Sequence, residues 1–153
     1  MEHPFIKGLA DGSLDEEKFK HWLKQDYIYL IEYARLFAIG AAKATDLTMM
    51  STYAQLMDGT LNTEMNLHRN YAKSFGISES ELEATEPAET TTAYTSYMLN
   101  MAQIGGVENV IAAILTCTWS YNYIGLKLDE QDAAKDHPLY REWVDMYLSL
   151  IHI

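Results

Sequence analysis

The chain has 153 residues, of which 48% are hydrophobic, so it is long enough and apolar enough for one globular domain with a core. Lysine and arginine total 11 against 22 aspartates and glutamates, and the net charge of −11 argues against a nucleic-acid partner. Its apolar runs are far shorter than the roughly 20 residues that a membrane-spanning helix needs, which argues against a membrane protein.

The N-terminal third is expected to hold one long helix. Residues 1–5 are predicted to be irregular, and Ser13 with Glu16 has the spacing of a capping box that opens a helix reaching about Ala44. Within this helix, Asp26 shares one face with two tyrosines at helical spacing, and we interpret that face as pointing inward.

The next helix is predicted from its caps and glycines. Asp46 is expected to cap a helix over residues 47–75, with Gly59 as a weak point inside it and Gly76 at its end. Ser78 begins a second capping box, which predicts a short acidic helical turn before a solvated connector.

Two further helices and a final segment complete the chain. Residues 90–104 are expected to form a helix, a long helix follows the glycine pair before Val107, and Pro138 is placed at the first turn of a last helix. Strand-like alternation is not sustained anywhere, so the predicted fold class is all-α.

The stretch from Gly105 to Leu128 is predicted to be a buried helix that organises the rest. Its apolar residues recur at helical spacing, and Cys117 lies four residues before Tyr121 on the same face. Several polar side chains interrupt the apolar pattern. Because buried polar atoms need partners, such a helix is typical of one that lines a pocket.

Cys117 can be interpreted in two ways. A lone cysteine is commonly a small buried hydrophobe, and as the only cysteine it cannot form an internal disulfide, which favours a reducing cytoplasm. As a nucleophile it would need a proton acceptor, and no histidine lies near it in the sequence. A carboxylic acid or a tyrosine would have to serve instead, and Asp26 is the inward-facing carboxylate that we name as a candidate.

A metal site is the competing hypothesis for a helical bundle. Glu64 and His68 are four residues apart and could face the same way. The sequence lacks a Glu-x-x-His pair, and its other histidines lie in loops or near the ends. We therefore expect a solvated Glu64 and a surface His68, with no metal and no other cofactor.

Five sequence blocks, in order, resemble the TenA/thiaminase II family. The resemblance covers nearly all of residues 3–147 and rests on these blocks: HPFIKGLADGSL (3–14), LKQDYIYL (23–30), YTSYM (94–98), LTCTWSYNYIGLKL (115–128) and HPLYREWVDMY (137–147). It implies an all-helical bundle of the haem-oxygenase-like kind that binds no haem.

The resemblance also implies an activity. Family members act as tetramers on aminopyrimidines or thiamin and release 4-amino-5-hydroxymethyl-2-methylpyrimidine, in thiamin salvage or degradation. The family cysteine attacks the pyrimidine ring, and Cys117 occupies its place. Asp26 matches the aspartate that binds the amidine edge of the ring, and the tyrosines that match pocket residues are Tyr29, Tyr94, Tyr121 and Tyr147.

The resemblance has limits at both ends of the chain. Family members have a helix before the HPF block and further helices after the last tyrosine, including one with a catalytic glutamate. We therefore expect residues 1–147 to be a partial TenA-type domain, incomplete at both ends. Residues 148–153 read like a translated transposon end used in sequencing libraries, and we expect an adapter-derived tail.

Three functional hypotheses remain open at this point. The first is a cysteine-dependent hydrolase acting on an aminopyrimidine or thiamin. The second is a non-catalytic aminopyrimidine-binding or regulatory protein of the same fold, which a ligand would stabilise without being hydrolysed. The third is a metal-dependent oxidase, which would need more histidine and glutamate ligands than the sequence offers.

Overall fold

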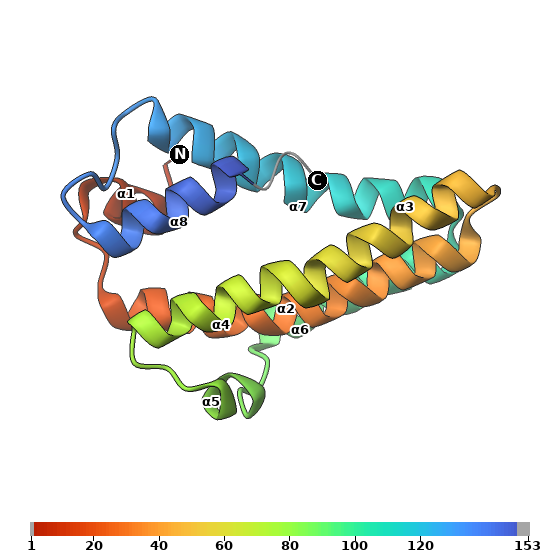
Figure 1. The fold of residues 1–153 in the computed structure, drawn as a ribbon, viewed down its shortest axis with the longest axis horizontal. Helices are drawn as coiled ribbons and strands as arrows, with labels where there is room; N and C mark the ends of the chain where they lie inside the picture. Colours follow the sequence, from red (N-terminus) through yellow and green to blue (C-terminus); the bar gives the residue numbers. More distant parts are fainter. Residues whose placement is uncertain (1, 150–153) are drawn as a thin grey trace. The chain divides into compact units, whose positions relative to one another are not determined.

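The computed structural model describes residues 2–149, and within this range the chain is helical and contains no strand (Figure 1). The predicted all-α class is confirmed. The chain divides into two compact units: the central unit is Lys20–Ile114, and the terminal unit combines the described residues up to Phe19 with those from Leu115 onward. In the described range, no helix is both long and apolar enough to cross a bilayer.

The irregular start predicted for residues 1–5 is confirmed at residues 2–3 and wrong from Pro4, where helix α1 (Pro4–Asp11) begins. The imidazole Nδ1 of His3 accepts a hydrogen bond from the Phe5 N–H at 3.2 Å and so caps the first turn. Proline suits the first turn because its missing N–H would have no intrahelical partner there. Gly12 ends the helix with a φ of 75°, a conformation that glycine adopts without steric cost.

Helix α2 (Glu16–Lys43) confirms the predicted long helix but begins at a different cap. The carboxylate of Asp15 accepts the backbone N–H groups of Glu17 at 3.0 Å and Lys18 at 3.2 Å. Ser13, the predicted cap, lies in the preceding turn instead. Aspartate is as good a cap as serine, and its negative charge also complements the helix N-terminus.

The predicted second helix is one rod in three segments, α3 (Leu47–Asp58), the π-helical η1 (Gly59–Glu64) and α4 (Met65–Ser74). The weak point expected at Gly59 is therefore the start of a π-helical stretch, where the hydrogen-bond ladder is wider. Gly76, at a φ of 73°, follows the end of the rod as predicted.

Two predicted caps are confirmed. The Asp46 carboxylate accepts the Met49 N–H at 2.8 Å at the start of α3. The Ser78 hydroxyl accepts the Glu81 N–H at 3.2 Å and opens the short helix α5 (Glu79–Glu83). Each satisfies a backbone donor that a helix N-terminus would otherwise leave without a partner.

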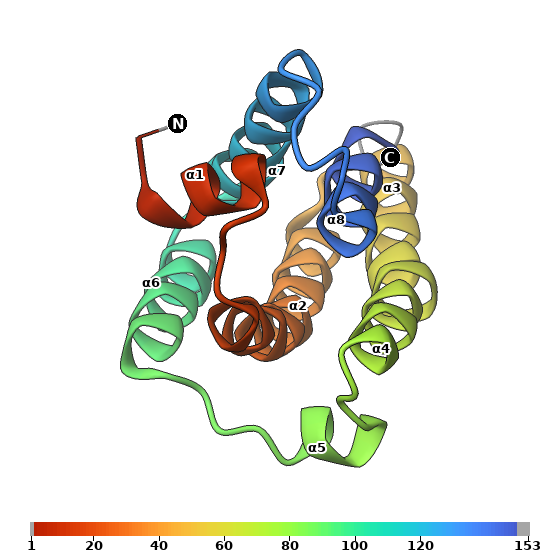
Figure 2. The same cartoon turned by 90° about the vertical axis from the view of Figure 1, so that its left-hand side faces the viewer.

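Within the central unit, α2 lies between the α3–α4 rod and α6 (Glu89–Ile104), as Figure 2 shows. On the rod side the backbone of Gly40 approaches the ring of Tyr53 closely. On the α6 side the ammonium of Lys43 donates to the backbone oxygen of Gln103 at 2.8 Å. A cation at that place also interacts favourably with the negative C-terminal end of the α6 dipole.

We expect Gly40→Ala to lower the free energy of unfolding by about 1–3 kcal/mol, because a Cβ there overpacks a buried contact. That Cβ would lie 2.7 Å from two ring carbons of Tyr53, which is only 5% exposed. Gly59→Ala is the matched control, since its Cβ meets nothing within 4 Å. Urea denaturation measures both; equal stability of the two variants would contradict the close approach.

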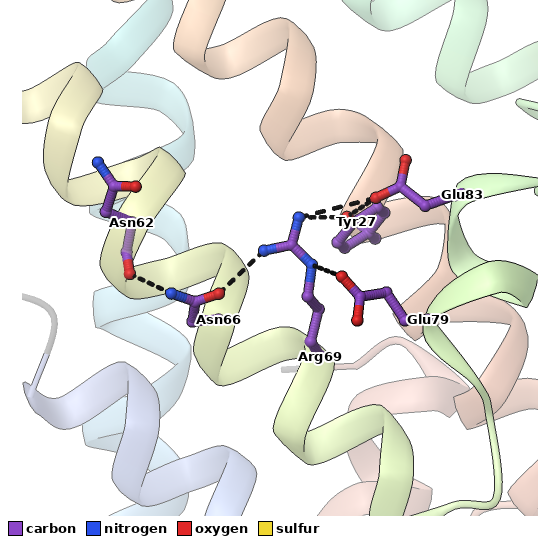
Figure 3. A network of polar contacts seen from close by, with 6 residues as sticks. All are labelled: Tyr27, Asn62, Asn66, Arg69, Glu79 and Glu83. Carbon is purple, nitrogen blue, oxygen red and sulfur yellow. Dashed lines mark hydrogen bonds and ion pairs between the residues drawn. The ribbon is translucent and has the colours of Figure 1, made fainter.

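Arg69 on α4 connects α5 to α2 through a polar network (Figure 3). Its Nη2 donates to the Tyr27 hydroxyl at 2.8 Å, and that hydroxyl in turn donates to the Glu83 carboxylate. Its Nε lies 3.2 Å from a carboxylate oxygen of Glu79, an ion pair without hydrogen-bond alignment. Nη1 donates to Asn66 at 3.0 Å. The network fixes the short α5 segment, which has few buried residues of its own.

Helix α7 (Val107–Asp129) corrects in part the prediction of a buried helix, because only one side of it is covered. Val110 and Leu128 are fully buried, but a stripe at four-residue spacing is exposed, at 59%, 63% and 43% for Leu115, Trp119 and Tyr123. Helical periodicity indicates that a face needs a partner. It does not indicate whether that partner lies within the same chain.

In the terminal unit, α8 (Pro138–Ser149) packs with the N-terminal turn. The Tyr140 hydroxyl donates to the backbone oxygen of Leu14 at 2.8 Å, and the Ala134 N–H donates to the oxygen of Ala10 at the same distance. The predicted tail, residues 148–153, lies largely outside the described residues.

Candidate functional site

Asp26 occupies the inward face of α2, as predicted, and is 7% exposed. Its Oδ2 lies 2.7 Å from Nε2 of His68 on α4. A carboxylate this buried requires a charged or hydrogen-bonding partner, because desolvation otherwise makes the ionised form costly. The neighbouring helix supplies that partner.

His68 contradicts the prediction of a surface histidine, because its side chain is fully buried. The ring Nδ1 lies 3.2 Å from the backbone oxygen of Glu64, and the Glu64 side chain is half-buried rather than solvated. A signal for this was present in the sequence. Met65 and Tyr71, three residues to either side, are both buried, so His68 belongs to the same inward stripe of α4.

The pKa values of His68 and Glu64 are both raised. Burial opposes the charged form of His68, but the hydrogen bond to Asp26 and the two nearby carboxylates outweigh it and raise the histidine pKa. Burial raises the pKa of the Glu64 carboxyl to about 7; the His68 charge opposes this rise and the Asp26 charge adds to it. The central unit therefore contains a buried histidine favouring its cationic form.

Aromatic rings lie on the same helix as Asp26. Tyr29, one turn further along α2, stacks on Tyr33 with ring centroids 5.4 Å apart. Tyr94 of α6 approaches the Tyr29 ring at 5.9 Å, and 45% of its surface is exposed. The three predicted site residues of the central unit are thus a buried carboxylate and two tyrosines in mutual contact.

Cys117 lies in the terminal unit, on α7, and its side chain is partly exposed. One turn later, Tyr121 stacks on Tyr147 of α8 with ring centroids 4.5 Å apart. The helices can approach closely here because Gly125 has no side chain; a Cβ on it would lie 3.4 Å from that of Tyr147. Tyr121 and Tyr147 therefore form one rigid aromatic pair beside the cysteine-bearing face.

The polar side chains of α7 differ in their exposure and in their hydrogen-bond partners. Thr116 and Thr118 are exposed, and the Ser120 hydroxyl donates to the backbone oxygen of Cys117 at 3.0 Å. Asn122 differs, because its Nδ2 is buried and has no hydrogen-bond partner among residues 2–149. That these polar groups line a pocket stays a prediction.

The six predicted site residues are divided equally between the two units. Asp26, Tyr29 and Tyr94 belong to the central unit, and the terminal unit holds Cys117 with the other two tyrosines. Among the described residues, no group of three or more His, Cys, Asp or Glu side chains could hold a metal ion. The available chemistry is that of a thiol, a buried acceptor for N–H donors, and flat aromatic faces.

The all-helical fold matches that of solved TenA-family proteins. A solved structure described as a TenA family transcription regulator, from a Silicibacter species, aligns with a TM-score of 0.89 at 31% identity, over 96% of this chain and 64% of that chain. The TENA/THI-4/PQQC family matches residues 1–150, and the chain belongs to this family.

Two relatives carry the same name, aminopyrimidine aminohydrolase. The protein from Halalkalibacterium halodurans is 59% identical over 147 residues, which are 96% of this chain and 66% of the relative. The protein from Helicobacter pylori is 37% identical over 149 residues, which are 97% of this chain and 69% of the relative. The chain thus spans about two thirds of the length of these relatives.

Proposed function

We propose that the protein is an enzyme of thiamin salvage or degradation, an aminopyrimidine aminohydrolase. The substrate would be an aminomethylpyrimidine or thiamin, and the product 4-amino-5-hydroxymethyl-2-methylpyrimidine. The observation that carries the proposal is the 59% identity to a relative of that name along 96% of the chain. The buried carboxylate, the tyrosines and the partly exposed thiol are consistent with this chemistry.

Asp26 would bind the amidine edge of the pyrimidine. A carboxylate accepts hydrogen bonds only, so it suits the exocyclic amino N–H and a protonated ring nitrogen. Because Asp26 is 7% exposed, those bonds would form with little competition from water. Tyr29 and Tyr94 offer aromatic faces for a flat heterocycle.

Cys117 would supply the nucleophile. Its thiolate adds to the electron-poor ring, forming a carbon–sulfur bond, and the electron pair then expels the leaving group from the exocyclic methylene. Water adds to the methylene carbon and loses a proton, and the carbon–sulfur bond breaks to restore the thiolate. The leaving group is the thiazole from thiamin, or ammonia from aminomethylpyrimidine. The departing amine must accept a proton, and the proton that the added water loses balances it.

We further propose that the protein acts as a homotetramer in the cytoplasm. The exposed stripe of Leu115, Trp119 and Tyr123 on α7 supports self-association, because exposed apolar residues at regular helical spacing favour burial against a partner. Sedimentation equilibrium measures the assembly, and a purely monomeric protein would contradict this part of the proposal.

Replacement of Cys117 by serine tests the nucleophile. We expect turnover of aminomethylpyrimidine to fall at least about 1000-fold, because a serine hydroxyl is a far weaker nucleophile without an adjacent base. Product release is measured by chromatography. Thr118→Ser, on the exposed side of the same helix, is the control and should retain the wild-type rate.

A binding protein without catalysis is the second candidate, since one solved relative is described as a transcription regulator. In that case the aminopyrimidine would raise the melting temperature of the protein while no product formed. Full turnover in the Cys117→Ser variant would contradict the role of Cys117 as nucleophile. The protein would then be a hydrolase with another mechanism.

A further inference from the structure

The imidazole of His68 faces two acceptors. Its Nδ1 lies 3.2 Å from the backbone oxygen of Glu64, which can only accept, so Nδ1 carries a proton. Its Nε2 lies 2.7 Å from Oδ2 of Asp26, a distance that requires one more proton between the two atoms. The ring is thus an imidazolium facing a carboxylate, or a neutral ring facing a protonated acid.

The charges around the ring favour the first arrangement. Asp26 from α2 and Glu64 from η1 are the ionisable groups that act on His68, and both raise its pKa against the opposing effect of burial. The indole of Trp22 lies 6.4 Å away, between ring centroids, and adds no charge. In that arrangement the Nε2–H of His68 donates to Oδ2 of Asp26.

We propose that His68 is a positioning residue for substrate recognition: its Nε2–H holds Oδ2 of Asp26 and sets the plane in which that carboxylate accepts the amidine edge of an aminopyrimidine. The inference rests on the proposed function and deepens it, because it names the group that orients the binding carboxylate. Neither the resemblance to the family nor the sequence pattern had indicated this role.

A carboxylate needs such a partner for a physical reason. The terminal torsion of an aspartate side chain is broad and has no sharp staggered minimum, so packing alone orients it poorly. Recognition of two adjacent N–H groups requires both the distance and the plane of the acceptor to be correct. A short hydrogen bond from a fully buried ring, itself fixed by the Glu64 carbonyl, restricts that torsion before the ligand arrives.

The first test compares two replacements of His68 in the intact protein. The probe is 4-amino-5-hydroxymethyl-2-methylpyrimidine, and its dissociation constant is measured by isothermal titration calorimetry. We expect His68→Leu to weaken binding about 10- to 100-fold, the range for losing a hydrogen bond to a charged group. His68→Gln should restore binding to within about threefold, because its amide N–H can reach the position of Nε2.

The second test is the pH profile of binding. In the wild type, affinity should fall as the pH rises through the raised pKa of His68, because the ring then loses one of its two donors. The glutamine of His68→Gln does not titrate, so this fall should be absent in that variant. The titration of the ligand is common to both proteins. Because the His68 charge also lowers the Glu64 pKa, both profiles are compared in a Glu64→Gln background, where their difference isolates His68.

A neighbouring buried polar residue serves as the control for simple destabilisation. Thr60 is 4% exposed and donates to the backbone oxygen of Leu56 at 3.0 Å, so Thr60→Val disturbs the same rod without touching Asp26. It should bind the probe as the wild type does. Wild-type affinity and an unchanged pH profile in both His68 variants would overturn the positioning role and leave the proposed function intact. Failure of the wild type to bind the probe would overturn both.

Discussion

Replacement of Trp143 by alanine is expected to lower the free energy of unfolding by about 3–5 kcal/mol, the range for deleting a buried aromatic side chain. Trp143 is 1% exposed and is the largest of the fully buried side chains. Its ring lies 4.6 Å from that of Tyr147 and 6.2 Å from that of Tyr121, between centroids. The alanine would leave a cavity that both tyrosines border, and neither helix could close it without losing other contacts.

The measurement is urea denaturation followed by circular dichroism, with Trp143→Phe as the conservative variant. Phenylalanine fills part of the same volume, so Trp143→Phe should lower the free energy of unfolding by less than half as much as Trp143→Ala. Because Tyr121 and Tyr147 were predicted as substrate-pocket residues, the alanine variant should also disturb ligand binding. A loss below about 1 kcal/mol for Trp143→Ala would show that the cluster is not packed as the structure describes.

The free energy of unfolding is expected to fall as the pH rises from about 4.5 to about 7, through Glu64. Its pKa is raised from 4.5 to about 7 by burial, so the folded chain binds this proton more tightly than the unfolded chain. The resulting stabilisation is full below the unfolded pKa and is lost as the pH passes the folded value. A displacement of this size corresponds to at most about 3 kcal/mol.

The pKa of His68 is also raised, so it acts in the same direction: its contribution is present below the ordinary histidine value and is lost above the folded one. The Glu64→Gln variant separates the contribution of Glu64 from that of His68, because the glutamine amide does not titrate. This variant should lose most of the slope between pH 5 and 7 and gain stability at pH 8 relative to the wild type. Glu142→Gln, at an exposed position, controls for the removal of one negative charge. A slope unchanged in Glu64→Gln would contradict the prediction.

Local signals predicted the helices well because each depends on neighbouring residues. The caps Asp46 and Ser78 are confirmed, as are the glycine at the end of the rod and the inward face that carries Asp26. The error at α1 is also a local one. Pro4 and Gly12 are the usual signals for the start and the end of a helix. The eight residues of α1 were too few for a clear helical periodicity between them.

The buried cluster could not be predicted in the same way, because it depends on a contact between distant parts of the chain. His68 and Asp26 are 42 residues apart in sequence, and only the packing of α4 against α2 brings them together. A histidine among apolar residues at helical spacing is a weak signal by itself. The exposed stripe of α7 was not predicted either. Burial of α7 was predicted from another apolar set, none of which is exposed, whereas residues 2–149 leave Leu115, Trp119 and Tyr123 uncovered; the set is Val110, Ala113, Ile114, Cys117, Tyr121 and Ile124.

Because the chain divides into a central and a terminal unit, the central unit can fold first during synthesis. The central unit is one continuous segment, Lys20–Ile114, so all its contacts are available as soon as that segment has left the ribosome. The terminal unit joins the two ends of the described chain; its bond from the Tyr140 hydroxyl to the Leu14 oxygen links residues 126 positions apart. Until the residues after Ile114 are made, the N-terminal helix lacks its contacts in the terminal unit, such as the bond from the Ala134 N–H to the Ala10 oxygen. A nascent chain released before that point would carry a formed central unit and an unpaired N-terminal helix.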